Sequence, residues 1–314
     1  MPRGFKKAKT SGAARQARQF RFDESLALFQ YMLSLFGCTS LDSLCEGMKD
    51  ETWEGWDEQN ISRYYYFLTT RLFEYPGITK EQLLRYDQNI TSQTMAISGR
   101  RGAFRWKYFQ YMALLFSEIY LDKYFNDPQG LLDGLNAQVT LLNSEREAAD
   151  KLPPYVLDDL NKVAFWQATG SGKTLIMHVN ILQYRHYLEK AGKHATLNRV
   201  ILLTPNEGLS EQHNGEFKLS SLPADIFNKE SGSLYAGQEI SIIDIHKLKE
   251  EGKEKTVSVD AFESNNLVLV DEGHRGAGGE EWMDKRNRLC SEGFSFEYSA
   301  TFGQAMKASG KKEM

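Results

Sequence analysis

The sequence predicts an α/β fold in which a parallel β-sheet follows an all-helical N-terminal segment. Residues 22–150 place their apolar side chains at helical spacings, whereas residues 161–301 alternate short apolar runs with helical stretches. Several of these runs are continuous and rich in β-branched residues, as in parallel strands that are buried on both faces. We therefore expect three parts: a basic flexible arm over 1–21, a helical accessory domain over 22–150 and an α/β lobe over 151–314.

Capping signals locate the helices of the first half. Asp23 is placed to begin a helix of apolar periodicity and Gly37 to end it, and Thr79 and Gln82 form a T-x-x-Q capping box. The longest candidate, 104–125, is apolar around most of its circumference, which predicts a helix that packs on several sides.

The second half contains five apolar runs that we expect to be strands. They cover 163–168, 199–204, 239–245, 267–271 and 294–300. Helical stretches separate them, so the sheet should be doubly wound, with its ligands at the carboxyl ends of the strands.

Composition excludes several classes of protein. The 314 residues are 41% apolar and 25% charged, which is typical of a globular chain. No apolar run approaches the roughly 18 residues of a membrane span, and no secretion signal is recognisable. Three scattered cysteines suit neither a disulfide framework nor a zinc site, so we expect a reducing, cytoplasmic setting and no membrane partner.

Charge is distributed unevenly along the chain. The net charge is -4, but residues 1–21 hold seven basic residues and no acidic one, which leaves -11 on the other 293 residues. Such an arm could contact nucleic-acid phosphates, or it could be a solvated tail.

The loop after the first expected strand has the composition of a phosphate-binding loop. It is ATGSGKT, Ala168 to Thr174, and it opens an apolar helix. Bound phosphates need N–H groups at a helix N-terminus, glycines for the tight turn, a lysine for charge and a hydroxyl for Mg²⁺. All are present, although Gln167 stands where the general pattern has its first glycine. The predicted nucleotide-binding residues are Thr169, Gly170, Ser171, Gly172, Lys173 and Thr174.

Two acids, Asp271 and Glu272, stand at the carboxyl end of the fourth expected strand. Asp271 there can hold Mg²⁺ through its water shell, and Glu272 can accept the proton of an attacking water or orient that water. An acid pair by itself would more often be a solvated strand end. The phosphate-binding loop upstream favours the catalytic interpretation.

Four motifs together resemble those of superfamily 2 helicases and translocases, in the usual order. The motifs are ATGSGKT, then Thr204-Pro205-Asn206 with Gln212-His213, then Asp271-Glu272-Gly273-His274, then Ser299-Ala300-Thr301. The D-E-x-H form is most similar to the motor (Res) subunits of type III restriction enzymes and related DEAD/DEAH-box proteins. In that family the first glycine of the phosphate-binding loop is commonly replaced, as it is here by Gln167.

The resemblance implies a RecA-like P-loop NTPase lobe that uses ATP and Mg²⁺ and moves on DNA, RNA not being excluded. Lys173, Asp271 and Glu272 would be catalytic, with Thr174 and Asp271 holding Mg²⁺. His274, Ser299 and Thr301 would couple the nucleotide state to the nucleic acid, and Thr204 and Pro205 would meet its phosphate backbone. Restriction or phage defence would be the setting.

Two further assignments keep an alternative beside them. Gln110 resembles the glutamine that relatives use to read the adenine edge, or it is a polar residue on a packed helix. Arg100, Arg101, Arg105 and Lys107, interleaved with Phe104 and Trp106, could grip a single strand, or they form a solvated helix start.

In the related motors, ATP lies between two RecA-like lobes, and the second lobe supplies an arginine finger. The sequence after Thr301 is polar and has no strand pattern, so we expect an incomplete first lobe and a separate second lobe or subunit as partner. The alternative is a non-motor module that binds ATP and docks a partner.

Overall fold

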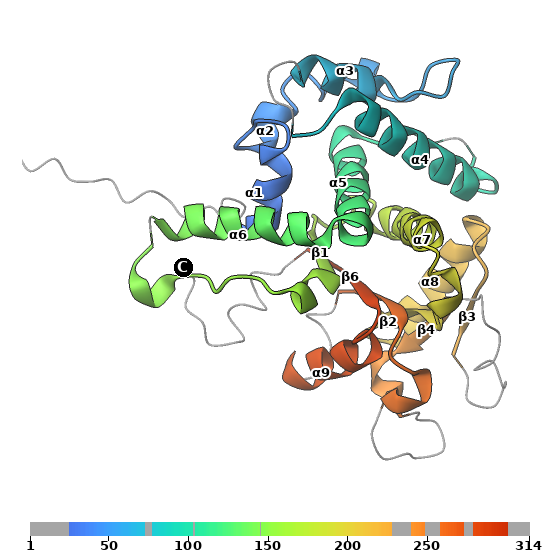
Figure 1. Ribbon diagram of the computed structural model, residues 1–314. Coiled ribbons are helices and arrows are strands. Elements are labelled where there is room, and N and C mark those ends of the chain that lie inside the picture. The colour runs from blue at the N-terminus through green and yellow to red at the C-terminus, as the bar shows by residue number, and fades with distance from the viewer. Residues whose placement is uncertain are drawn as a thin grey trace, which may run out of the picture.

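The computed structural model describes residues 25–72, 77–102, 104–144, 146–227, 240–248, 258–272 and 279–300. Helices make up the first half of this part of the chain and precede a helix-flanked sheet, as expected (Figure 1). The α-helices are α1 (Ala27–Ser34), α2 (Leu41–Leu44), α3 (Arg63–Arg71), α4 (Lys80–Ser98), α5 (Tyr108–Asn126), α6 (Pro128–Ser144), α7 (Lys173–Lys190), α8 (Glu207–Leu219) and α9 (Gly279–Leu289). The expected arm over 1–21 lies outside the described residues.

The sheet has six parallel strands in the order β1-β6-β5-β2-β4-β3. They are β1 (Lys162–Trp166), β2 (Arg199–Thr204), β3 (Ala224–Ile226), β4 (Ile240–Asp244), β5 (Asn266–Asp271) and β6 (Phe294–Ser299). All five apolar runs are strands, which confirms the predicted parallel sheet. The prediction missed β3, whose three residues are too few to show a periodic pattern.

One face of the sheet shares its core with the N-terminal helices. A single hydrophobic cluster continues from Met32 on α1 through Leu115 on α5 and Ile176 on α7 to Phe296 on β6. Figure 1 shows these helices on one side of the strands, with α9 on the other. The boundary between a helical domain and an α/β lobe therefore stays a prediction, because no separate core marks it.

The opposite face carries a smaller cluster. Val268 and Val270 of β5 pack there against Phe262, in the 3-10 helix η9 (Val259–Phe262), and against Leu289 of α9. Since consecutive residues of a strand point to opposite faces, Leu267 and Leu269 belong to the first cluster and Val268 and Val270 to the second.

The expected N-terminal signature of α4 is present. Thr79 Oγ1 accepts from the backbone N–H of Gln82 at 3.1 Å, and the Gln82 side chain accepts from the N–H of Thr79 at 2.9 Å. This reciprocal pair confirms the predicted capping box.

Polar side chains join α5 to α7 inside the first cluster. We call this group the α5–α7 network: Ser117, Glu118, Asn180, Gln183, Tyr187 and Tyr298. Asn180 Nδ2 donates to Ser117 Oγ at 3.0 Å, and Tyr298 Oη donates to Asn180 Oδ1 at 2.7 Å. Each bond crosses from one element to another, so the network fixes the N-terminal helices against the sheet.

Two expectations from composition can be compared with the structure. Within the described ranges, no helix combines the length and apolar character that a membrane crossing requires. All three cysteines are free thiols, Cys45 and Cys290 being buried and Cys38 partly exposed.

Candidate nucleotide site

The loop between β1 and α7 forms a tight turn at a helix N-terminus. Gly170 and Gly172 have φ of 78° and 88°, in the left-handed region that glycine adopts without strain. The N–H of Ser171 donates to the carbonyl of Ala168 at 3.2 Å, and Gly172 is the N-cap of α7. Because glycine has no side chain to cap the helix, the first-turn N–H groups suit an anion such as phosphate.

Lys173 connects this loop to the acids that follow β5. Its side chain is 10% exposed, and Nζ donates to the carbonyls of Gln167 and Ala168, each at 3.3 Å. The same Nζ lies 3.6 Å from Glu272 Oε1. The structure thus brings together the lysine and the acid that the sequence placed 99 positions apart.

The backbone turns sharply where β5 ends. Glu272 has a φ of 52°, which is rare for a residue with a side chain, and its N–H donates to the carbonyl of Tyr298 at 2.9 Å. Strain of this kind persists where neighbouring structure enforces it. Here it holds the Glu272 carboxylate beside Lys173, with Asp271 next to it on the strand.

Asp271 has a partner that the sequence did not indicate. Its Oδ2 lies 2.9 Å from Nε2 of His213 on α8, and both side chains are nearly buried, 12% and 4% exposed. In the sequence, His213 stands in the second motif, and nothing there indicates a role at the acids. Only the folded arrangement shows this contact, since 58 positions separate the two residues.

Gln110 reaches the phosphate-binding loop from the N-terminus of α5. Its Nε2 donates to the carbonyl of Ser171 at 2.7 Å, and its Oε1 accepts from the N–H of Lys107 at 2.9 Å. The side chain also lies so close to Gly172 that a Cβ at that position would overlap with it. The adenine-reading role stays a prediction, and the observed contact is with the loop itself.

The other predicted residues have different environments. Thr169 is exposed, Ser171 and Thr174 are partly buried, and Ser299 is fully buried, its carbonyl accepting from the N–H of Gln167 at 3.1 Å. His274 and Thr301 lie outside the described residues.

The predicted nucleic-acid contacts are not on the surface. Thr204 and Pro205 are buried, and the Thr204 hydroxyl pairs with that of Ser210 at 2.7 Å. The exposed positions that follow are Asn206, which is the N-cap of α8, and Glu207 and Gly208 in the first turn of that helix. A contact of the Thr204 hydroxyl with a phosphate backbone therefore stays a prediction, one that requires this loop to rearrange.

The basic cluster after α4 does not form a free strand-binding platform. Arg101 Nη2 pairs with Glu216 Oε2 at 2.6 Å, Lys107 pairs with Glu54 at 2.8 Å, and Trp106 is 2% exposed. The Trp106 indole donates to Thr94 Oγ1 at 2.8 Å. Burial of Trp106 and the internal pairing of Arg101 disfavour the strand-gripping interpretation for these two residues. Lys107 is exposed beside its ion pair, and its role stays a prediction.

A histidine on α7 adjoins α8 without reaching the acids. His178 Nδ1 lies 2.7 Å from Ser220 Oγ, and its ring stacks on that of Phe217 with centroids 4.3 Å apart. Burial, together with the positive charge of Arg101 nearby, holds the pKa of His178 well below its usual value. Its imidazole is therefore neutral near pH 7.

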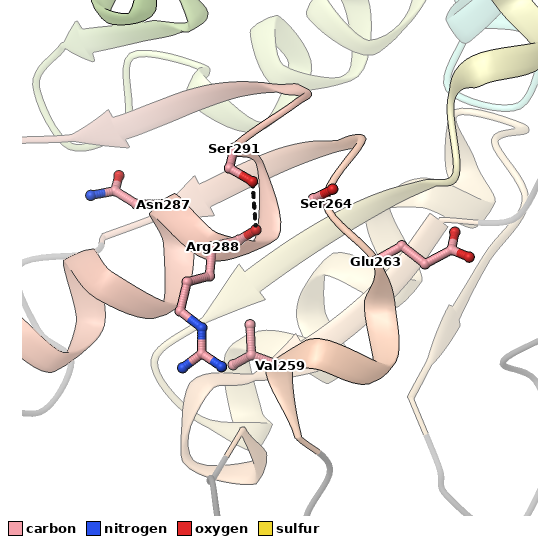
Figure 2. A pocket seen from close by; sticks show the side chains of 6 residues that line it. All are labelled: Val259, Glu263, Ser264, Asn287, Arg288 and Ser291. Carbon is pink, nitrogen blue, oxygen red and sulfur yellow. Dashed lines mark hydrogen bonds between the residues drawn. The ribbon is translucent and has the colours of Figure 1, made fainter.

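A depression lies at the end of β5 opposite the acids, between η9 and α9 (Figure 2). Its volume is about 530 Å³, and Figure 2 shows Glu263 and Arg288 on different sides of it. It is lined by Val259, Glu263, Ser264, Asn287, Arg288 and Ser291. No predicted site residue lines it, and among the described residues no group of three or more His, Cys, Asp or Glu could hold a metal ion.

The residues at the carboxyl ends of β1 and β5 fit a magnesium nucleotide. The left-handed glycines allow the tight turn, Lys173 supplies a cation, and Asp271 and Glu272 supply carboxylate oxygens, which Mg²⁺ prefers.

Comparison with known proteins identifies a family for this chain. Residues 135–304, more than half of the chain, match the family described as "Type III restriction enzyme, res subunit". Among solved structures, the UvsW helicase from bacteriophage T4 is similar, with 16% sequence identity over 87% of this chain and 91% of that chain and a TM-score of 0.32. None of the curated proteins matches the chain.

Proposed function

Since the chain belongs to the type III restriction enzyme res subunit family, we propose that it binds and hydrolyses ATP as a motor lobe that moves along DNA. Membership of this family supports a helicase-type motor domain with a RecA-like fold. The finer proposal, DNA translocation in restriction or phage defence, rests on the family and on the chemistry of the site.

The contact of Lys173 with both sides of the site carries the proposal. Its Nζ lies within 3.6 Å of Glu272 and hydrogen-bonds two carbonyls of the phosphate-binding loop. These are exchangeable partners, because a phosphate oxygen offers the ammonium a stronger, charge-assisted hydrogen bond. Lys173 would then hold the β- and γ-phosphates against the N-terminus of α7.

Two residues would hold the metal ion. Thr174 at the start of α7 supplies a hydroxyl, and Asp271 at the end of β5 supplies a carboxylate. Bound Mg²⁺ neutralises phosphate charge. The pairing of Asp271 with His213 fixes one carboxylate oxygen and leaves the other for this task.

Glu272 is the proposed general base. Its enforced backbone conformation places the carboxylate at the site, where it accepts a proton from the attacking water or orients that water. Ser299, on the strand between β1 and β5, would transmit the nucleotide state, together with His274 and Thr301.

The test combines nucleotide binding with turnover. A fluorescent ATP analogue with Mg²⁺ should bind the wild-type chain, and Lys173→Ala should weaken binding or turnover by about 10²–10³-fold. Glu272→Gln should retain binding and lose turnover by about 10²–10⁴-fold. Lys190→Ala, at the exposed far end of the same helix, is the matched control.

The track is tested in the same assay. ATP turnover should rise when single- or double-stranded DNA is added. If RNA raises turnover more than DNA does, the motor moves on RNA. If ATP binding depends on Lys173 but no phosphate is released, with or without nucleic acid, the non-motor module is favoured.

A further inference from the structure

His213 is a buried polar residue with one partner in the catalytic region. Its Nε2 lies 2.9 Å from Asp271 Oδ2, and the side chain is 4% exposed. An ionised carboxylate can only accept hydrogen bonds, so Nε2 carries the hydrogen and donates it.

The helix that carries His213 is held at both ends. At its start, Asn206 Oδ1 accepts from the N–H of Leu209 at 3.0 Å, and Ser210 bonds Thr204 at the end of β2. Near its end, Arg101 pairs with Glu216 and donates from Nε to Ser220 Oγ at 2.8 Å. Because α8 is held at both ends, the position of the His213 imidazole beside Asp271 is fixed.

Structural stability does not account for a histidine at this position. The other ring nitrogen, Nδ1, is buried and has no hydrogen-bond partner among the described residues. A buried polar atom without a partner is unfavourable, and an aliphatic side chain of similar size would avoid it. What the histidine adds is the bond to Asp271.

We propose that His213 is a positioning residue that fixes the Asp271 carboxylate through Oδ2, so that Oδ1 is the oxygen available to the metal ion of the bound nucleotide. The inference rests on the proposed function. Hydrogen bonds to a ligating carboxylate typically change metal affinity or activity by about 10–100-fold.

Metal affinity gives a readout that does not depend on turnover. Mn²⁺ replaces Mg²⁺ as the probe, and free Mn²⁺ is measured by electron paramagnetic resonance while it is titrated into the full chain with the non-hydrolysable analogue AMP-PNP. Binding of AMP-PNP without metal is measured separately. The variants are His213→Leu, which lacks a donor, and His213→Gln, whose amide can reach Asp271.

We expect His213→Leu to weaken Mn²⁺ binding about 10–100-fold and to leave metal-free AMP-PNP binding unchanged. His213→Gln should restore most of the loss. His178→Leu is the matched control, because it removes another buried histidine beside Phe217 that bonds Ser220 instead of an acid. It should leave Mn²⁺ affinity unchanged, whatever its effect on melting temperature.

Two results would overturn the positioning role: wild-type Mn²⁺ affinity in His213→Leu, or an equal loss in His213→Gln. If His213→Leu does not fold, His213→Asn takes its place, because the asparagine side chain is one methylene shorter than glutamine and its amide cannot reach Asp271. Failure of the proposed function is recognised separately. In that case wild type would hold no more Mn²⁺ than Lys173→Ala, and the role of His213 would fall with it.

Discussion

Two polar clusters lie along α7, and they differ in what their hydrogen bonds connect. In the α5–α7 network, side chains of different elements bond one another within the core, as Tyr298, Asn180 and Ser117 do. At the N-terminus of α7, Lys173 bonds loop carbonyls and lies 3.6 Å from Glu272, whose backbone is strained. The hydrogen bonds of the first cluster thus hold elements of the fold together, whereas a bound phosphate could replace those that Lys173 makes in the second.

This difference predicts opposite consequences of mutation. Changes in the α5–α7 network should lower stability and leave ligand binding by the folded protein intact. Changes at the N-terminus of α7 should act mainly on the ligand, as in the Lys173→Ala experiment above.

The largest stability effect should come from Asn180→Leu. The substitution leaves the Tyr298 hydroxyl and the Gln183 amide oxygen without the partner that Asn180 provides in a closed core. We expect the free energy of unfolding in urea to fall by about 2–4 kcal/mol. Asn126→Leu, at the exposed end of α5, should cost less than about 0.5 kcal/mol and serves as the control. A small loss in Asn180→Leu, or a loss of nucleotide binding at full folding, would remove the contrast between the clusters.

The next effect depends on pH and comes from Glu118. Burial raises the pKa of this carboxyl from its usual 4.5 to about 7, although Tyr187 and Asn89 donate to it. As pH rises from 4.5 to 7, the unfolded chain loses the proton before the folded chain does, so the free energy of unfolding falls. The free energy of unfolding stops falling about one pH unit above the folded pKa, where both states have lost the proton.

Glu118→Gln removes this proton equilibrium and keeps the shape of the side chain. Relative to wild type, the variant should gain roughly 2–3 kcal/mol between pH 4.5 and pH 7, measured by urea unfolding at several pH values. A difference between the two proteins that does not change with pH would mean that folding leaves the pKa of Glu118 at its usual value.

A third prediction concerns the contact between α5 and the loop at the N-terminus of α7. Gly172 combines a φ of 88° with a Cβ position that overlaps Gln110 Nε2, so Gly172→Ala should cost about 2 kcal/mol. Gln110→Ala should cost about 1 kcal/mol, and the double variant should lose about 1 kcal/mol less than the sum, because the overlap is gone. Gly170→Ala is the control: its φ is 78°, but nothing lies within 4 Å of its Cβ position. The interpretation would be contradicted if the losses in free energy of unfolding from Gly172→Ala and Gln110→Ala simply added. It would also be contradicted if Gly170→Ala showed the same coupling energy with Gln110→Ala.

Local patterns allowed much of the fold and part of the site to be predicted. The five longer strands and the loop at Gly170–Thr174 are contiguous signals, and the acids after β5 gain meaning from that loop. The edge strand β3 has only three residues, too few for periodicity to be visible.

The contacts that the sequence missed are long-range. His213 meets Asp271 across 58 positions, and Asn180 meets Tyr298 across 118. A histidine or asparagine in a helical segment gives no sign of its partner until the helices pack. The same limit applies to Arg101 and Trp106, because charge and aromaticity do not reveal that one is paired and the other buried.

The smallest effect tests the strand-gripping interpretation of Arg101 directly. Arg101 links the chain after α4 to α8 through Glu216 and Ser220, with 14% of its side chain exposed. Arg101→Met should therefore lower the free energy of unfolding by about 1 kcal/mol, as expected for one partly exposed ion pair. Arg100→Met, at the exposed neighbouring position, should change it by less than about 0.5 kcal/mol. Neither variant should alter the affinity for a labelled single-stranded oligonucleotide, measured by fluorescence anisotropy over a range of salt concentrations. Weaker binding with a shallower salt dependence in Arg101→Met alone would return this arginine to the nucleic-acid track, because losing a phosphate contact reduces the number of released counterions.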